Sequence, residues 1–308
     1  MNVRGYEFSF GWMFAIIAGA ALVGIALYAG VRFISVGQEG TGSIEAAQLS
    51  VLFTPLGSSI EEGKLSFLEL PKEDSIVLGC SSQGLGSTSF RVVQDDFGER
   101  VSGRTSSSLS YVASAVELKG KRFRALTKPI LFPYKVGDMI ILFEDSERYC
   151  FVDAPNELEE ELVALNSSNL VVVSGASRCP AGSKSVCFGS AGCSIRVELA
   201  EGLVVKGRKS VPFDLRFGTG LLFAAIVSDP MIYTCQLERL MHRAGLLADL
   251  YIAKTNYLST QGCSSGLASE LELFSNELGE YSGGSLHSLA SLAQSIERDH
   301  DALICTLY

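Results

Sequence analysis

An uncharged apolar segment near the amino terminus constrains this chain more than any other feature. It extends from Phe8 to Val31 and is bounded by Glu7 and Arg32. About 24 residues in one helix are long enough to cross the hydrocarbon core of a bilayer, because each residue adds about 1.5 Å of length. The sequence therefore predicts a transmembrane anchor, with the residues after it on one side of the membrane.

Two patterns indicate how the anchor is oriented. Arg4 precedes the segment, and positive charge beside a span favours the cytoplasmic side, although Arg32 follows the segment. All eight cysteines come after the segment, and an even number is typical of disulfides in an oxidising compartment. We therefore expect a plasma-membrane protein with a cytoplasmic amino terminus and an extracytoplasmic carboxyl-terminal domain.

A cleaved secretory signal is the competing interpretation of the same segment. The apolar core of such a signal usually has about 7–15 residues and ends at small residues. This segment is longer, and the bulky Tyr28 stands where a small residue is wanted. The pattern favours an anchor.

Small residues recur along the segment at intervals of four. Gly11, Ala15 and Gly19 form one series, and Ala20 with Gly24 forms another. Small residues at this spacing permit close approach of two helix backbones in a membrane. The expected partners of the segment are membrane lipid and either other envelope proteins or copies of the same chain.

The first residues also carry a family resemblance. Arg4-Gly5 followed by Tyr6-Glu7-Phe8-Ser9-Phe10 resembles the start of archaeal type IV pilin-like precursors, which have a class III signal. The resemblance implies cleavage between Gly5 and Tyr6 and a helix that builds a filament core. The acidic residue here is the second after Gly5, whereas the pilin pattern places it fifth. The stretch is also similar to uncharacterised single-span archaeal envelope proteins.

The rest of the chain divides by composition and hydrophobic period. Residues 1–36 comprise the tail and anchor, and residues 37–54 form a Gly-rich polar stalk. Residues 55–228 are predicted to form a β-rich, partly α/β ectodomain, and residues 229–308 a helical region packed on it. The expected fold class is α+β, with a mostly antiparallel or mixed sheet.

Period-two patterns and short apolar runs predict most of the β structure. Tight hairpins are expected at Lys119-Gly120-Lys121 and at Glu201-Gly202. A short helix over residues 156–165 separates two strands, an order that permits a parallel pair. The predicted strands cover residues 65–70, 75–79, 90–93, 111–118, 122–126, 139–143, 149–153, 170–174, 185–188, 195–199, 203–206 and 222–227.

The last eighty or so residues change to a helical period. Asp229-Pro230 is a strong helix start, and the amphipathic pattern continues to about Leu258 with Arg239 placed away from the apolar face. Two shorter helices are predicted over residues 267–278 and 285–298.

The cysteine pairing has more alternatives than the sequence can separate, since eight cysteines allow about 105 connectivities. A bridge among Cys179, Cys187 and Cys193 would stabilise a stretch poor in apolar side chains, and Cys80 with Cys150 would close the amino-terminal sheet. Of the remaining three, either one bonds outside the group or one stays free. The eight candidates are Cys80, Cys150, Cys179, Cys187, Cys193, Cys235, Cys263 and Cys305.

No motif supports catalysis strongly. Gly262 to Gly266 fits the G-x-S-x-G pattern around Ser264, but a nucleophile elbow needs a preceding strand and a helix is predicted there. We therefore expect a non-catalytic chain without metal or cofactor. Adjacent carboxylates are expected to be solvated, and the three histidines, His242, His287 and His300, are expected on the surface.

Charge and surface motifs narrow the partners further. The net charge is −9, and it becomes −10 when Arg4, Glu7 and Arg32 are left out, so nucleic acid would be repelled. Asn166-Ser167-Ser168 is an N-glycosylation acceptor pattern. The leading hypothesis is a membrane-anchored envelope protein with a binding or structural role. The alternatives are a pilin-like filament subunit and a tethered extracytoplasmic hydrolase.

Overall fold

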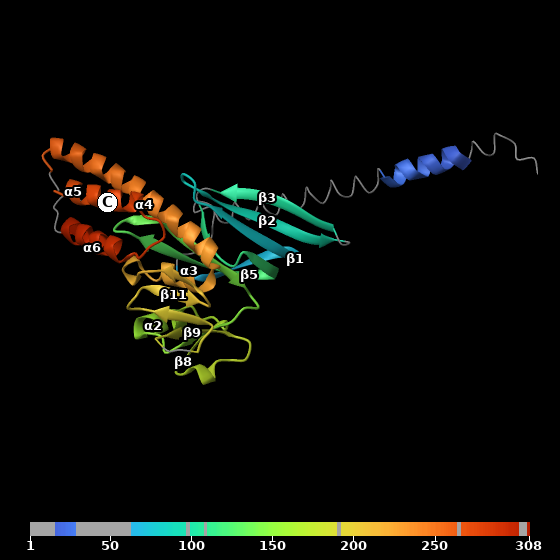
Figure 1. The fold of residues 1–308 in the computed structure, drawn as a ribbon, viewed down its shortest axis with the longest axis horizontal. Coiled ribbons are helices and arrows are strands. Elements are labelled where there is room, and N and C mark those ends of the chain that lie inside the picture. The colour runs from blue at the N-terminus through green and yellow to red at the C-terminus, as the bar shows by residue number, and fades with distance from the viewer. Residues whose placement is uncertain are drawn as a thin grey trace, which may run out of the picture.

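The fold is α+β, as predicted, and is built on two six-stranded sheets (Figure 1). The computed structural model describes residues 16–28, 63–96, 99–107, 110–189, 192–263, 266–301 and 307–308. The stalk predicted over residues 37–54 lies outside these residues.

The first sheet is antiparallel except at one edge. Its order is β3-β2-β1-β5-β6-β4, and β4 pairs in parallel with β6. The sheet curls back on itself: the Thr88 hydroxyl of β2 donates to the carbonyl of Ser110, just before β4, at 2.9 Å, although these strands are far apart in the strand order. One face therefore encloses a small core of its own that includes Phe90 and Val112. The strands are β1 Leu65–Ser81, β2 Ser87–Asp96, β3 Glu99–Ser107, β4 Tyr111–Ala113, β5 Glu117–Leu131 and β6 Lys135–Glu144.

The second sheet is parallel over four strands at one end, in the order β10-β9-β7-β8, and antiparallel at the other end. The helix α2, Asn156–Ala164, connects β7 to β8, and the parallel pair predicted from this order is confirmed. The next strand, β9, lies on the other side of β7, and β10 continues the parallel part. A hairpin at Glu201-Gly202 then adds antiparallel strands, as predicted. The strands are β7 Tyr149–Val152, β8 Leu170–Val173, β9 Lys184–Phe188, β10 Ile195–Glu198, β11 Leu203–Lys206 and β12 Lys209–Pro212.

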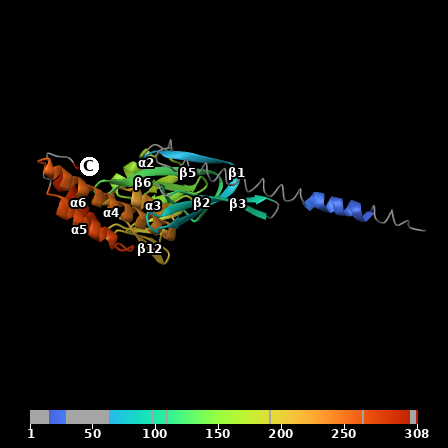
Figure 2. The ribbon, with the colours of Figure 1, turned by 90° about the horizontal axis from the view of Figure 1, so that it is seen from above.

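Helices fill the space between the sheets and extend beyond them. The short helix α3, Gly220–Val227, is almost wholly buried in the large core that contains side chains of both sheets. The helix α4, Pro230–Thr260, packs its first half on the first sheet. The helix α5, Ala268–Gly279, packs along the protruding second half of α4, and α6, His287–Asp301, packs on α5 (Figures 1 and 2). The predicted start is confirmed, because the Asp229 side chain accepts a hydrogen bond from the amide of Met231 at 2.8 Å.

Three local predictions are wrong. Residues 222–227 form helix α3 rather than a strand, because a helix buried on every side has no polar face to reveal its period. Lys119-Gly120-Lys121 lies inside β5, where Gly120, with φ of 138°, is opposite an irregularity in β1. The strand predicted over residues 111–118 divides into β4 and the start of β5, whereas residues 65–79 form one strand.

The amino-terminal helix is described over residues 16–28. Within the described part of the chain, no helix combines the length and the apolar character of a membrane span.

Candidate functional site

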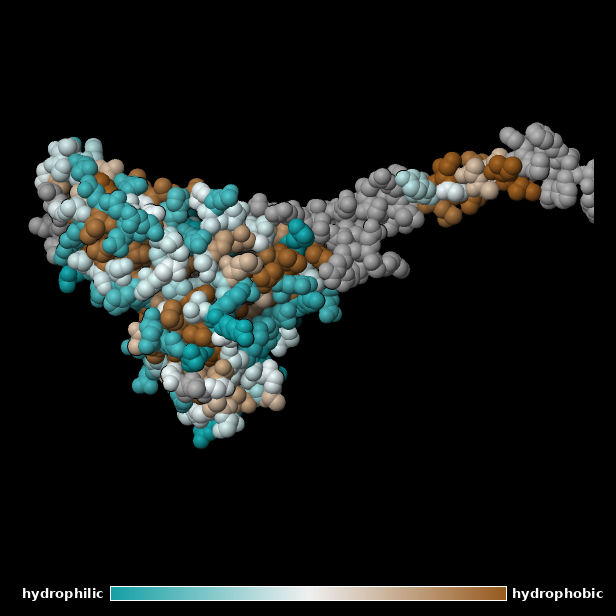
Figure 3. Space-filling view, viewed as in Figure 1, coloured by the Kyte–Doolittle hydropathy of each residue, from teal (hydrophilic) through white to brown (hydrophobic). Residues whose placement is uncertain are grey.

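The amino-terminal helix exposes its apolar side chains. Ile17, Leu22 and Tyr28 are 65%, 69% and 68% exposed, and the helix stands apart from the folded body with a strongly hydrophobic surface (Figure 3). Of the residues predicted to pack in a membrane, Gly19, Ala20 and Gly24 lie here and are exposed. The others, Gly11 and Ala15, and the possible processing residues Gly5 and Tyr6, lie outside the described residues.

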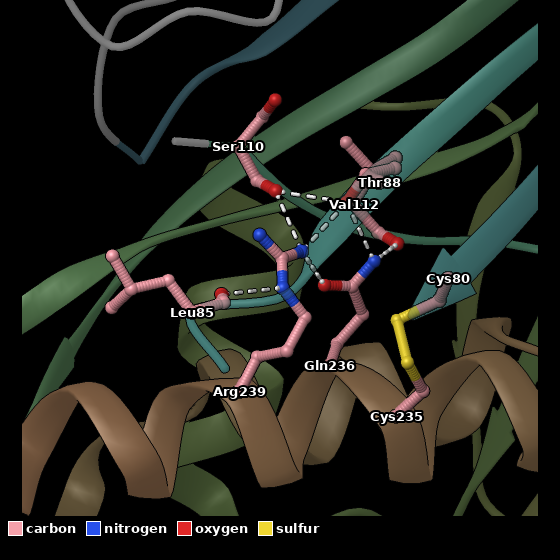
Figure 4. The surroundings of a disulfide bond; sticks show 8 residues. All are labelled: Cys80, Leu85, Thr88, Ser110, Val112, Cys235, Gln236 and Arg239. Carbon is pink, nitrogen blue, oxygen red and sulfur yellow. Dashed lines mark hydrogen bonds between the residues drawn. A yellow bond between two sulfur atoms is a disulfide. The ribbon is translucent and has the colours of Figure 1, made fainter. Parts of the chain in front are cut away.

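The disulfides differ in part from the predicted pairs. Cys80 bonds to Cys235 and Cys150 bonds to Cys179, so the predicted Cys80–Cys150 bridge is wrong. The reason is position: Cys80 lies near the end of β1 beside α4 (Figure 4), whereas Cys150 lies on β7 of the second sheet. The predicted bridge within the Gly/Ser-rich stretch is confirmed as Cys187–Cys193.

The carboxyl-terminal cysteines follow one of the two alternatives. Cys235 bonds outside its group, to β1. Cys263 is also disulfide-bonded, and Cys305 lies outside the described residues.

Two of these bridges cover one face of the second sheet. Along β7, Phe151 faces the large core and contacts the ring of Phe223 in α3. Cys150 and Val152 point the opposite way and form a small buried cluster with Cys187 of β9, on which Cys179 and Cys193 pack. The two bridges therefore shield one face of the second sheet from water. The opposite face is covered by the large core, which includes α3.

A buried polar centre joins α4 to the first sheet (Figure 4). Arg239 is fully buried, and its Nη1 donates to the Thr88 hydroxyl at 2.8 Å, to the Ser110 carbonyl at 3.0 Å and to Gln236 Oε1 at 2.6 Å. The Gln236 amide donates in turn to the Thr88 hydroxyl at 2.9 Å and to the Val112 carbonyl at 3.1 Å. The Cys80–Cys235 bridge lies next to this centre.

Burial and an aromatic ring act on Arg239 in opposite directions. Burial lowers the pKa of the guanidinium, and the neighbouring Tyr111 raises it. The guanidinium carbon lies 4.7 Å from the centre of the Tyr111 ring, a geometry that stabilises a cation. The prediction that Arg239 lies away from the packed face is wrong, because the first sheet covers a second face of α4. The sequence carries no signal for this second contact.

A cleft of about 510 Å³ opens where β7 and β8 end. Asp153, Asn156 and Arg178 line it, and Asp153 has a positive φ of 56°. The Asp153 carboxylate accepts a hydrogen bond from the amide of Gly175 at 3.2 Å. Ligands of open α/β sheets bind at the carboxyl ends of parallel strands, which is the position of this cleft.

The histidines do not share one environment. His242 and His287 are exposed, as predicted. His300 is only 8% exposed, so its predicted exposure is wrong: its Nε2 accepts the amide of Leu307 at 2.9 Å, and its ring stacks on Tyr308. The described residues include no group of three or more His, Cys, Asp or Glu that could hold a metal ion.

The remaining sequence candidates have separate positions. Ser264 lies outside the described residues, and the preceding Gly262 and Cys263 directly follow α4, so a helix rather than a strand leads into this motif. Asn166 is exposed after α2, and its glycosylation stays a prediction.

No family model, curated protein or solved structure matches this chain.

Proposed function

We propose that this chain is a non-catalytic, membrane-anchored protein of the cell envelope, whose extracytoplasmic body binds or packs against other surface components. The exposed amino-terminal helix is the observation that carries the proposal. Each Å² of apolar surface left in water costs about 25 cal/mol, and Ile17, Leu22 and Ile25 are all at least 65% exposed. Lipid around this helix and the apolar residues flanking it in the sequence would remove that cost.

The disulfide framework supports the extracytoplasmic side. Bridges persist in oxidising compartments and are rare where cellular thiols keep cysteines reduced. Here the bridges are part of the packing, because Cys150 and Cys187 are fully buried in the second sheet. In a reducing compartment the Cys150–Cys179 and Cys187–Cys193 bridges would be lost, and this face of the second sheet would be exposed to water.

The polar interior supports a role in binding or structure rather than in catalysis. Arg239 holds α4 against the first sheet, and the Arg124 guanidinium donates to Asp145 at 2.6 Å and to the Ser167 hydroxyl at 2.9 Å. These groups connect elements of the fold to one another.

Membrane extraction of the full-length chain tests the anchor. We expect the chain, reconstituted into liposomes, to float with them and to resist extraction by alkaline carbonate. The double variant Leu22→Arg/Ile25→Arg should be released, whereas Val163→Arg, which changes an equally exposed apolar residue of α2, should behave as the parent chain. Extraction of the parent chain, or retention of the double variant, would contradict the proposal.

Thiol labelling of the native protein tests the compartment. Protein isolated from its own cells under denaturing, non-reducing conditions should take up no thiol reagent at the cysteines of the three described bridges, and should take it up after reduction. Labelling at Cys150 and Cys179 without reduction would show that the body matures in a reducing compartment.

A pilin-like filament subunit is the second candidate. It is favoured by the open faces at Gly19 and Gly24, where an added Cβ would meet no atom within 4 Å. Intact-mass measurement of the native protein separates the two candidates: loss of residues 1–5 supports the filament subunit, and a retained amino terminus opposes it.

A further inference from the structure

The helix α6 is attached at both ends through a histidine ring. It packs on α5 and on the short turn η2, Leu215–Phe217, and Figure 1 shows α5 between α4 and α6. His287 is the first residue of α6, and His300 is the last but one. At each end the ring nitrogen that makes the contact accepts a hydrogen bond, so both attachments depend on the protonation of the imidazole.

At the carboxyl end, the His300 ring holds residues 307–308. Its Nε2 accepts the backbone amide of Leu307 at 2.9 Å, and the amide of Tyr308 lies 3.4 Å from the same nitrogen. Backbone amides only donate, so Nε2 carries a lone pair and the proton of the ring is on Nδ1. Leu307 is fully buried, and the Tyr308 ring stacks on the imidazole. This contact therefore fixes a packed segment of the chain.

At the amino end, Arg216 of η2 holds the His287 ring. The guanidinium donates to both oxygens of Asp214, from Nε at 3.0 Å and from Nη2 at 2.7 Å, and Nη2 also lies 3.1 Å from His287 Nδ1. An arginine has donors only, so Nδ1 is the acceptor of this contact. The Nη1 atom donates to the Ser291 hydroxyl of α6 at 3.0 Å, so one arginine connects η2 to the first turn of the helix.

Protonation of either ring removes its acceptor. An imidazolium has an N–H group on both nitrogens and accepts no hydrogen bond, and imidazoles gain this proton between about pH 5 and 8. In His300 the new N–H group would face two amide N–H groups in a site that is only 8% exposed. In His287 it would face a guanidinium. Each ring therefore favours the attached helix when it is neutral.

The charges around the ring at the carboxyl end leave this balance in place. Asp301 lies 3.8 Å from Nδ1, which is too far for a hydrogen bond, and its side chain is 79% exposed, so water screens its attraction for a charged ring. Lys254 of α4 donates to the carbonyl of Leu307 and adds a positive charge to the same segment. Burial, followed by the charge of Glu297, raises the pKa of Tyr308, so the stacked ring stays neutral.

The charges around His287 act in the same way. Its neighbouring carboxylate, Asp214, is already paired with Arg216. Glu201 lines the same cleft, which has a volume of about 240 Å³. The guanidinium remains the charged group in contact with the ring, and like charges at this distance repel.

One contact of α6 should instead strengthen in acid. Burial, followed by the charge of Asp299 of α6, raises the pKa of Glu270 of α5. Protonation of one carboxylate removes the repulsion between the two helices at this point. This contact takes up one proton, whereas opening of both attachments takes up two. The histidines therefore determine the response near pH 6, above the ordinary range of carboxyl groups.

We propose that α6 and residues 307–308 form an acid-weakened clasp, which is closed while His287 and His300 are neutral and opens more often when they gain a proton. The buried side chains of Leu289, Ala293 and Ile296 keep the clasp mostly closed at neutral pH. Opening uncovers the part of α5 on which α6 packs. The clasp does not depend on the proposed anchor, so either proposal can fail without the other.

Hydrogen exchange of the full-length chain tests the clasp. The open state binds protons that the closed state cannot hold, so acid favours opening. With an ordinary pKa of about 6.5 for each released ring, the opening constant of α6 should rise about tenfold per histidine between pH 7.5 and 5.5, after correction for intrinsic exchange. The first half of α4, which packs on the first sheet, is the internal reference. An equal change in α6 and in this reference would overturn the proposal.

Amide side chains that accept a hydrogen bond at every pH provide the variants. In His300→Gln the Oε1 atom can replace Nε2, and in His287→Asn the Oδ1 atom can replace Nδ1. Each change should remove about tenfold of the pH effect, and the double variant should remove nearly all of it. His242→Gln, at the exposed histidine of α4, is the matched control and should keep the full effect, as should Glu270→Gln.

The outcomes separate the role of the rings from a general loss of packing. A double variant that is closed at pH 7.5 and keeps the full pH effect would overturn the role of the histidines. Where a variant opens α6 at both pH values, the measurement on the parent chain decides by itself, because it needs no substitution.

Discussion

At the scale of residues, the most demanding side chain is Arg239. Burial of a cation is costly, and the structure offsets the cost with three acceptors on Nη1 and with the face of the Tyr111 ring. The aliphatic part of the side chain needs room as well. Gly86 supplies it, because a Cβ there would lie 2.3 Å from the Ser81 carbonyl and 2.7 Å from the Arg239 Cγ and Cδ atoms.

The space beside Arg239 gives a prediction with a matched control. Gly86→Ala should lower the free energy of unfolding by about 2–4 kcal/mol, because the new methyl group meets backbone at a positive φ of 65°. Gly84→Ala, at a φ of 61° with open space around it, should cost only about 1 kcal/mol. Urea unfolding of both variants measures the difference. Equal losses would mean that the Arg239 packing does not restrict this position.

At the scale of elements, one lysine joins β11 to the junction of α3 and α4. The Lys206 ammonium donates to the carbonyl of Ser228, the first of the two residues between these helices. Burial, followed by the charge of Lys184, lowers the pKa of Lys206 from 10.5 to about 8. The junction is therefore held by an ammonium that loses its proton more easily in the folded chain than in the unfolded chain.

This shifted pKa predicts a pH dependence of stability. Between about pH 8 and 10.5 the unfolded chain binds a proton at Lys206 that the folded chain has released, so the free energy of unfolding rises with pH in this window. The difference between the parent chain and Lys206→Met should therefore shift in favour of the parent by about 1–3 kcal/mol. Urea unfolding at pH 7.5, 8.5 and 9.5 measures it, and a constant difference would refute the shift.

The elements also separate what the sequence could predict from what it could not. The helices α4, α5 and α6 were predictable because each has an apolar face and a solvent-exposed polar face. The helix α2 was predictable because its sequence lies between two apolar strands. The helix α3 is apolar all round, so its period is hidden. The strand β12 was missed because its four residues begin with Lys209-Ser210, which resemble a loop.

The candidate sites were less predictable than the elements. The exposed apolar helix follows from composition alone. Arg239 is buried because the first sheet packs on a face of α4 whose sequence pattern is polar at this position. Cys80 pairs with Cys235 because β1 ends beside that helix. Both depend on tertiary arrangement, which no local pattern of residues encodes.

At the scale of the whole molecule, the Cys80–Cys235 bridge connects the first sheet to the helical region across 155 residues of sequence. The enclosed stretch includes every strand of the second sheet. Closing so long a loop removes much conformational entropy from the unfolded chain, which is the usual source of stabilisation by a disulfide.

Removal of this bridge should therefore destabilise the whole molecule. The double variant Cys80→Ser/Cys235→Ser should lose about 4–5 kcal/mol in the free energy of unfolding. Cys80→Ser alone should lose nearly the same amount, because either change breaks the one bond. Denaturant unfolding of both variants is the measurement, and a double variant that loses twice as much as the single would point to packing of the sulfurs instead.

The length of that same bridge has a consequence for biosynthesis. A ribosome releases Cys80 long before Cys235, and Cys150, Cys179, Cys187 and Cys193 all emerge in the interval. The first thiol that a nascent Cys80 can meet is Cys150, the wrong one. The correct bridge can therefore form only after Cys235 has emerged, and any earlier bond at Cys80 has to be exchanged for it, so an isomerase in the compartment where the body folds should speed maturation.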